Sequence, residues 1–312
     1  MTGAPDARGR FVPGERVLLI DPKDRRYLVR LQPAARFQTH SGILDHDDLI
    51  GGEPGAIVYA RRPGAEGEGR PFLAFRPTLA DVVVKMPRGA QVIYPKDLGA
   101  ILLAADLFPG ARVLEAGVGS GALSMAALRA GCRVVGYELR ADFAARARAN
   151  VEALLGPAAD YQVHERDVYE GIDERDLDRI LLDLPEPWRV VPHAEDALAP
   201  GGILLAYLPT INQTAELRAA LGRSGFVLAE TVEVLHRSWH VEGRSVRPDH
   251  RMVAHTGFLT TARLLAASAR RQRSALPEDG HAEGAGLESP SETPESGPQT
   301  PPRGEDEISP AR

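Results

Sequence analysis

Hydrophobic and polar residues follow two different patterns along this chain, and the change comes near residue 80. Short alternating segments in residues 11–80 are separated by Gly- and Pro-rich connections, which predicts strands joined by turns. The expected strands are Arg16–Asp21, Tyr27–Leu31, Ala56–Ala60 and Pro71–Phe75. Residues 1–80 are therefore predicted to form a small β-rich N-terminal domain, with an exposed hairpin loop at Arg61–Arg70.

Helical and strand-like segments alternate from residue 97 onward. This alternation predicts a Rossmann-like α/β domain with a mostly parallel, doubly wound sheet over residues 81–270. Two late β segments, Val227–Arg237 and Met252–Ala262, have no helix of normal length between them, so we expect them to be antiparallel at the sheet edge. The other predicted strands are Arg112–Glu115, Arg133–Glu138, Gln162–Glu165, Arg179–Asp183 and Ile203–Leu208, and the predicted helices are Asp97–Leu107, Gly121–Ala130, Asp142–Leu155, Val191–Leu198 and Gln213–Gly222.

Charge is distributed unevenly along the 312 residues, whose net charge is −6. Residues 274–312 carry nine acidic residues and two arginines, so the rest of the chain is close to neutral. This acidic segment is rich in Pro, Gly and Ser, and we predict a disordered tail over residues 271–312. Arg237–Arg273 contains eight arginines and only two acids. That stretch permits contact with a polyanion, although a solvated helical face explains the charge equally well.

Several protein classes are disfavoured by the composition. The single cysteine, Cys132, excludes a disulfide scaffold and a thiolate metal cluster. We expect no metal site, because the spacing of His40, His46, Asp47 and Asp48 fits no familiar ligand set. No segment approaches the roughly 20 apolar residues of a membrane-spanning helix, and the N-terminus lacks an apolar signal core. A cytoplasmic location without membrane contact is the expectation.

A glycine-rich turn follows the predicted strand Arg112–Glu115. Gly117, Gly119 and Ala122 satisfy the dinucleotide fingerprint G-x-G-x-x-G/A, in which glycines let the backbone approach a ligand at a helix N-terminus. Glu138 comes 21 residues after Gly117 and would accept hydrogen bonds from ribose hydroxyls. The turn predicts a nucleotide cofactor, and by itself it is compatible with an NAD-dependent oxidoreductase.

Acidic residues stand at the ends of several predicted strands, where ligands bind in open α/β sheets. They are Glu115, Glu138, Asp167 and Asp183. Asp183 begins the sequence Asp-Leu-Pro-Glu-Pro-Trp, an acid–proline–aromatic loop that is typical of amino-methyltransferases and that a dehydrogenase does not need. The alternative is that Asp183 only caps the next turn.

Together these segments resemble the bacterial tRNA (adenine-58-N1)-methyltransferases over about residues 11–265. The resemblance implies a class I methyltransferase fold, a mostly parallel seven-stranded sheet with an antiparallel edge, preceded by the small β domain. The segments that carry it are Gly14–Asp21, Arg76–Leu79, Met86–Gly89, Tyr94–Asp97, Leu114–Leu123, Asp183–Trp188 and His255–Leu259.

The resemblance also implies the cofactor, S-adenosylmethionine, and its contacts. Glu138 would hold the ribose hydroxyls, Phe143 would lie beside the adenosine, and Asp167 would contact the adenine. The glycine loop would face the methionine portion through Gly117, Gly119, Ser120, Gly121, Ala122 and Leu123.

For catalysis, the resemblance implies that Asp183 lies between cofactor and target base, orienting the adenine and stabilising its developing charge. Tyr94 would line the base pocket, whereas for Gln91 and Lys96 a plain strand-to-helix connection, with Asp97 as helix cap, is as good an interpretation.

The implied partner is tRNA, bound at its T-loop and elbow, and the family forms homotetramers. Arg247, Arg251 and His255 are the candidate RNA contacts, and Trp239 would either stack on a base or act as an apolar anchor. Three alternatives remain: a methyltransferase of relaxed site (57/58), an RNA-binding module without turnover, and the oxidoreductase.

Overall fold

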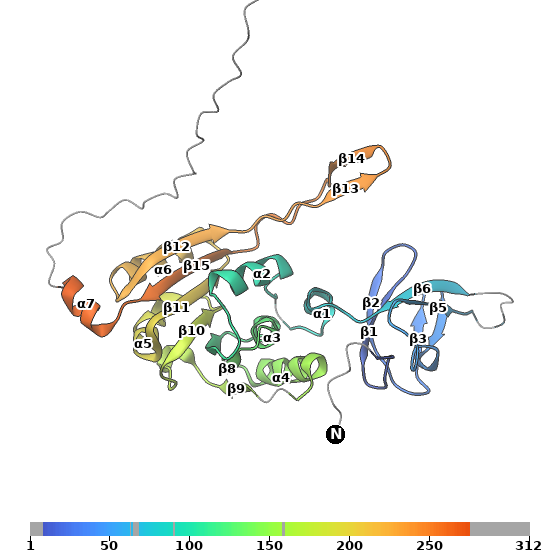
Figure 1. Ribbon diagram of the computed structural model, residues 1–312, viewed down its shortest axis with the longest axis horizontal. Coiled ribbons are helices and arrows are strands. Elements are labelled where there is room, and N and C mark those ends of the chain that lie inside the picture. The colour runs from blue at the N-terminus through green and yellow to red at the C-terminus, as the bar shows by residue number, and fades with distance from the viewer. Residues whose placement is uncertain (1–8, 63, 65–68, 90, 158–159, 275–312) are drawn as a thin grey trace, which may run out of the picture. The chain divides into compact units, whose positions relative to one another are not determined.

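The N-terminal β region forms its own small sheet. A computed structural model describes residues 9–62, 64, 69–89, 91–157 and 160–274 (Figure 1). Within the N-terminal region, an antiparallel sheet has the order β2-β1-β6-β5, and β3 and β4 form a separate hairpin. Its buried core includes Phe11, Val17, Leu19 and Phe72. The strands are β1 (Arg16–Ile20), β2 (Arg26–Arg30), β3 (Arg36–Thr39), β4 (Gly42–Asp45), β5 (Ala56–Ala60) and β6 (Arg70–Phe75).

The four strands predicted here match β1, β2, β5 and β6 to within one residue at each end. The sequence analysis missed β3 and β4, because a strand of four residues is too short to establish a clear alternation. The expected loop Arg61–Arg70 lies partly outside the described residues. A short helix, α1 (Leu79–Lys85), follows the sheet and begins with a capping box between Thr78 and Asp81.

The second part of the chain is built on a seven-stranded sheet in the order β12-β15-β11-β10-β7-β8-β9. The neighbours from β11 to β9 are parallel, whereas β15 is antiparallel to both β11 and β12. The predicted α/β class and its antiparallel edge are confirmed. The strands are β7 (Arg112–Ala116), β8 (Arg133–Glu138), β9 (Tyr161–Glu165), β10 (Leu177–Leu182), β11 (Leu198–Leu208), β12 (Phe226–Glu233) and β15 (Phe258–Leu264).

Helices cover both faces of this sheet because alternate strand residues point to opposite sides. Leu181 and Leu205 pack in one cluster with side chains of α1 to α4, whereas Ile180 and Leu204 pack in a second cluster with α5 and α6. The helices are α2 (Pro95–Ala104), α3 (Ala122–Arg129), α4 (Ala141–Leu155), α5 (Val191–Ala197), α6 (Ile211–Gly222) and α7 (Ala267–Ser274). The expected disordered tail lies outside the described residues from residue 275 onward.

A two-stranded extension, which we call the arm, joins β12 to β15. It contains the hairpin β13 (Trp239–Glu242) and β14 (Ser245–Pro248) (Figure 1). Between this hairpin and the large sheet, an antiparallel bridge from His236 to Val253 pairs the two segments of the arm. The prediction of one continuous strand over Met252–Ala262 is wrong in its first half. The regular strand begins only after Gly257, where an added Cβ would meet the Tyr207 ring at 2.5 Å.

In the described part of the chain, no helix combines the length and apolar character that crossing a membrane requires.

Candidate active site

The glycine-rich turn between β7 and α3 has the backbone that the sequence predicted. Gly117, Gly119 and Gly121 all have positive φ angles, of 83°, 56° and 82°, which favour glycine. A Cβ on Gly117 would lie 2.1 Å from the carbonyl oxygen of Asp183, so only glycine allows this contact between the turn and the end of β10. Gly121 is the N-cap of α3. The turn therefore lies against Asp183 at its start and opens α3 at its end.

An unpaired hydroxyl lies within this turn. Ser120 is 4% exposed, and its Oγ has no hydrogen-bond partner among the described residues. Asn150 of α4, which the sequence analysis missed, donates from Nδ2 to the carbonyls of Ser120 and Pro87, at 3.1 Å each. Since an unsatisfied buried polar atom is costly, the Ser120 hydroxyl fits a polar ligand bound in the turn.

Glu138 lies at the end of β8, as predicted, and faces the same turn. Its carboxylate accepts hydrogen bonds from the backbone N–H groups of Gly119, at 2.9 Å, and Arg140, at 3.0 Å. Each carboxylate oxygen retains a second lone pair, so Glu138 can still accept from a diol. Phe143 lies in the first turn of α4, with the Arg140 guanidinium 3.9 Å from its ring centroid. The two side chains predicted for the ribose and the adenosine thus lie on consecutive elements.

Asp167 follows β9 and caps a short 3-10 helix, Val168–Glu170. Its Oδ1 accepts from the N–H of Tyr169 at 2.9 Å. Both carboxylate oxygens of Asp167 retain a lone pair that could accept from an amino group, and the predicted contact with adenine stays a prediction.

The carboxyl ends of the parallel strands, which we call the rim, carry Glu115 on β7 and Asp183 after β10, and both carboxyl groups have strongly raised pKa values. Burial, together with the nearby charge of Glu138, raises the pKa of Asp183 to about 7. Burial raises the pKa of Glu115 to about 8, and repulsion from Asp183 and Glu138 adds to the effect although the Ser124 hydroxyl donates to Glu115. No cationic side chain pairs with Asp183 or Glu115 in the described part of the chain. A positively charged ligand would relieve both groups.

Tyr94 borders a cavity of about 390 Å³ that is also lined by Pro95, Lys96, His236 and Val253. Tyr94 is the N-cap of α2, and Pro95 occupies the first turn, a position that suits proline because no backbone N–H is needed there. The expectation that Asp97 caps this helix is wrong. The helix begins two residues earlier than predicted, which places Asp97 inside its first turn.

Tyr207, at the end of β11, was missed by the sequence analysis. Its hydroxyl donates to the carbonyl of Thr256 at 2.7 Å. Burial, with the charges of Asp97 and Asp183 nearby, raises the pKa of Tyr207 to about 12. The strand-end rule that selected the acidic residues applies to Tyr207 equally and could have identified it.

Comparison with known proteins assigns the family. The family model for the tRNA methyltransferase complex GCD14 subunit matches residues 72–250, and the TrmI-like N-terminal model matches residues 9–58. The tRNA (adenine(58)-N(1))-methyltransferase TrmI of Thermus thermophilus is 37% identical over 256 residues, which cover 81% of this chain and 98% of that protein. The chain belongs to the TrmI family of tRNA methyltransferases.

Two further proteins are similar over most of this TrmI-family chain. The tRNA (adenine(57)-N(1)/adenine(58)-N(1))-methyltransferase TrmI of Methanocaldococcus jannaschii is 33% identical over 276 residues, which cover 79% of this chain and 94% of that protein. The crystal structure of a SAM-dependent O-methyltransferase from Thermotoga maritima has a TM-score of 0.77 at 33% identity, covering 83% of this chain and 96% of that one. The expected methyltransferase fold is thereby confirmed.

The predicted RNA contacts of this TrmI-family protein lie on or beside the arm. Arg247, on β14, and Arg251, just beyond it, are both exposed. Trp239 is 60% exposed, so it is not an anchor in the core of this chain. His255 lies at the base of the arm, where both of its ring nitrogens have protein partners. Gln91 is exposed, whereas the Lys96 ammonium is engaged by Asp97.

Proposed function

We propose that this protein transfers the methyl group of S-adenosylmethionine to N1 of adenine 58 in the T-loop of tRNA. The observation that carries the proposal is the position of Asp183. In a TrmI-family chain, the Asp183 backbone lies against the glycine turn, and its carboxyl group has a raised pKa and no cationic partner among the described residues. A sulfonium cofactor on one side and an adenine amino group on the other would supply what it lacks.

The residues of the rim fit this cofactor. The backbone around Ser120, Gly121, Ala122 and Leu123, with the unpaired Ser120 hydroxyl, would hold the methionine portion. Glu138, beside the turn, would accept from the ribose hydroxyls. Phe143, in the first turn of α4, would lie beside the adenosine, and Asp167, after β9, would contact the adenine. Bound there, the cofactor supplies an electrophilic methyl group.

The acceptor needs alignment more than activation. Adenine N1 already carries a lone pair in the plane of the ring, so no strong base is required. Asp183 would accept a hydrogen bond from the exocyclic amine, which orients the ring and stabilises the positive charge that it gains. Gly117 holds the Asp183 backbone in place, and Tyr94 and Tyr207 would border the base.

Reaching adenine 58 requires the base to leave its stack, which costs roughly a few kcal/mol. Contacts to phosphates elsewhere on the tRNA would offset this cost. The exposed Arg247 and Arg251 of the arm, together with the N-terminal β region, are the surfaces that we assign to this role.

We also propose that the protein acts as a homotetramer. Apolar side chains are exposed along the arm, among them Leu235 (56%), Val241 (71%) and Val246 (61%), and burial between subunits would remove them from water. Sedimentation or light scattering of the full chain would give the mass of four subunits, and a monomer would contradict this assignment.

The direct test uses labelled S-adenosylmethionine and unmodified tRNA transcripts with adenine 58 either intact or replaced by another base. We expect label in the intact transcript only. Equal label in both transcripts would mean that another base is methylated. Position 57 would be the first candidate, because the Methanocaldococcus relative is named for both positions. Cofactor binding without label would favour an RNA-binding module without turnover.

A further inference from the structure

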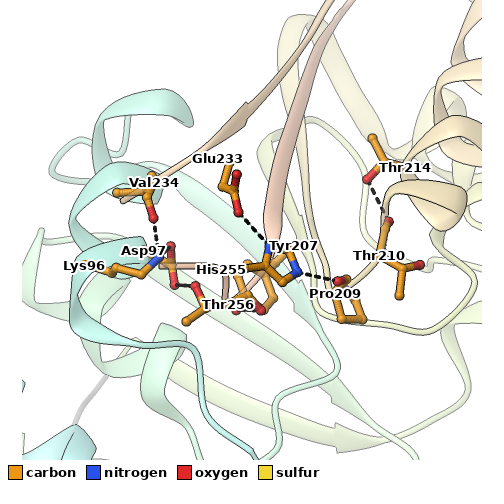
Figure 2. A network of polar contacts seen from close by, with 10 residues as sticks. All are labelled: Lys96, Asp97, Tyr207, Pro209, Thr210, Thr214, Glu233, Val234, His255 and Thr256. Carbon is orange, nitrogen blue, oxygen red and sulfur yellow. Dashed lines mark hydrogen bonds and ion pairs between the residues drawn. The ribbon is translucent and has the colours of Figure 1, made fainter. Parts of the chain in front are cut away.

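At the base of the arm, where it leaves β12 and returns to β15, both segments are hydrogen-bonded to side chains of α2 (Figure 2). The Lys96 ammonium donates to Asp97 Oδ1 at 2.7 Å and to the carbonyl of Val234 at 2.6 Å. The Thr256 hydroxyl donates to Asp97 Oδ2 at 2.6 Å. Val234 follows β12 and Thr256 precedes β15, so α2 holds the outgoing and the returning strand of the arm at once.

His255 fastens the same two strands to the end of β11. Its Nδ1 lies 2.7 Å from Glu233 Oε1, and its Nε2 lies 2.8 Å from the carbonyl oxygen of Pro209 (Figure 2). A carboxylate and a carbonyl can only accept hydrogen bonds. Both ring nitrogens must therefore carry a proton, and the geometry selects the imidazolium form of His255.

The contacts continue from Pro209 to the loop that begins with Asp183. Thr210 is the N-cap of α6; its hydroxyl accepts from the N–H of Gln213 at 3.3 Å and donates to Gln213 Oε1 at 2.7 Å. The Gln213 side chain donates from Nε2 to the carbonyl of Pro185 at 2.9 Å. Pro185 is two residues beyond Asp183. Hydrogen bonds on either side of the Pro209–Thr210 peptide bond thus link the base of the arm to the Asp183 loop.

We propose that His255 is a positioning residue for methyl transfer: by donating to Glu233 and Pro209 together, it sets the base of the arm against the segment that braces the Asp183 loop. This inference rests on the proposed function, in which the arm holds tRNA while Asp183 orients the target adenine. His255 acts through the protein rather than on the substrate, because both of its nitrogens are already occupied.

The surroundings of His255 set the direction of its pH dependence. The Pro209 carbonyl and the Glu233 carboxylate raise the pKa of His255, whereas the charge of Lys96 on α2 opposes this effect. On β15 the nearest ring, that of Phe258, is uncharged and lies 4.9 Å away. A raised pKa means that the cation is complete at low pH and is lost as the pH rises through that value. Deprotonation leaves one of the two acceptors without a donor.

The test compares two variants with a matched control. His255→Gln keeps one donor but neither the ring nor the charge, and Glu233→Gln keeps the shape but removes the carboxylate. His164→Gln is the control, because His164 is an exposed histidine on β9, at the opposite edge of the sheet. For each protein, single-turnover methylation of a tRNA transcript, KM for tRNA, cofactor Kd and the melting temperature would be measured between pH 6 and 9.

We expect His255→Gln to lower the single-turnover rate about tenfold or more, since small misplacements of reacting groups carry large rate costs. KM for tRNA, cofactor Kd and melting temperature should stay close to those of the wild type. The wild-type rate should fall as the pH rises through the raised pKa of His255. Glu233→Gln should move this fall to lower pH, and His255→Gln should abolish it.

A double-mutant cycle with Gln213→Ala tests the connection itself. If the contacts act as one unit, the rate loss of the double variant will be smaller than the product of the two single losses. Independent losses, an unchanged rate in His255→Gln, or a raised KM alone, which would indicate direct RNA contact, would each overturn the inference while wild-type activity upholds the proposed function. A wild type that leaves adenine 58 unmodified would contradict both.

Discussion

Two groups of buried carboxyl side chains, Asp97 on α2 and the pair Asp183 and Glu115 at the rim, differ in how their negative charge is compensated. Asp97, at the base of the arm, is fully buried, and its two oxygens accept from Lys96 and Thr256. Asp183 and Glu115, at the rim, have pKa values raised by burial and by neighbouring carboxylates, and neither has a cationic partner in the described part of the chain. The charge of Asp97 is thus compensated within the protein, whereas Asp183 and Glu115 would be compensated by a positively charged ligand.

This difference distinguishes a carboxyl group that stabilises the fold from carboxyl groups that take part in binding or catalysis. A buried ion pair whose hydrogen bonds are complete fixes a geometry, and removing one partner leaves the other charge uncompensated. Carboxyl groups with raised pKa values in a cleft are instead typical of binding and catalytic sites. The comparison therefore predicts that changes at Asp97 act on stability, whereas changes at Asp183 act on turnover.

The largest effect is expected for Asp97→Ala, which leaves the buried Lys96 ammonium without its carboxylate. We expect the free energy of unfolding to fall by about 3–5 kcal/mol. Chemical denaturation of the full chain measures this change. The control is Glu53→Ala, because the Arg10–Glu53 ion pair is exposed and should contribute less than about 1 kcal/mol. Equal losses in the two variants would contradict the assignment of Asp97 to structure.

Asp183→Asn should leave the fold intact and lower kcat by about 100- to 1000-fold, the range found when one preorganised electrostatic contact to a transition state is removed. Cofactor affinity should fall little. Methylation of tRNA transcripts and calorimetric titration with S-adenosylmethionine measure the two quantities. Glu165→Gln, which changes an exposed acid at the end of β9, is the control. Turnover that survives Asp183→Asn would remove Asp183 from the mechanism.

A smaller effect is expected for Glu115→Gln, and it depends on pH. The folded-state pKa of about 8 lies above the ordinary value, so the contribution of Glu115 to stability is complete at low pH and is lost as the pH rises through 8. Between pH 6 and pH 9 this loss is about 3 kcal/mol. Glutamine mimics the neutral acid, so denaturation at the two pH values should show a shallower decline than in the wild type. An identical decline would mean that Glu115 is ionised throughout.

The rim was predictable from sequence because two simple rules converge on it. Ligands bind beyond the carboxyl ends of parallel strands, and glycines mark the turn where the backbone must approach. These rules placed Glu138, Asp183 and the glycine turn where the structure has them. Tyr207 also follows this rule, but it was not predicted, because a tyrosine at the end of an apolar strand is usually interpreted as a residue of the hydrophobic core.

The base of the arm was harder to predict. Asp97 has the position of a plausible helix cap, and only the folded chain brings Thr256, 159 residues away, to its carboxylate. Asn150 is similar, because its partners lie in two loops that are distant along the sequence. Hydrogen bonds between segments that are distant in the sequence produce no local sequence pattern, so these residues can be identified only from the folded structure.

Calorimetry tests most directly whether the rim carboxyl groups are compensated by the positive charge of a bound ligand. Titration at pH 7 with S-adenosylmethionine and with its product S-adenosylhomocysteine, which lacks the sulfonium charge, would be repeated in buffers of different ionisation enthalpy. A sulfonium beside Asp183 and Glu115 lowers their pKa values, so binding of S-adenosylmethionine should release more protons than binding of the product. Equal proton release for the two ligands would contradict the account.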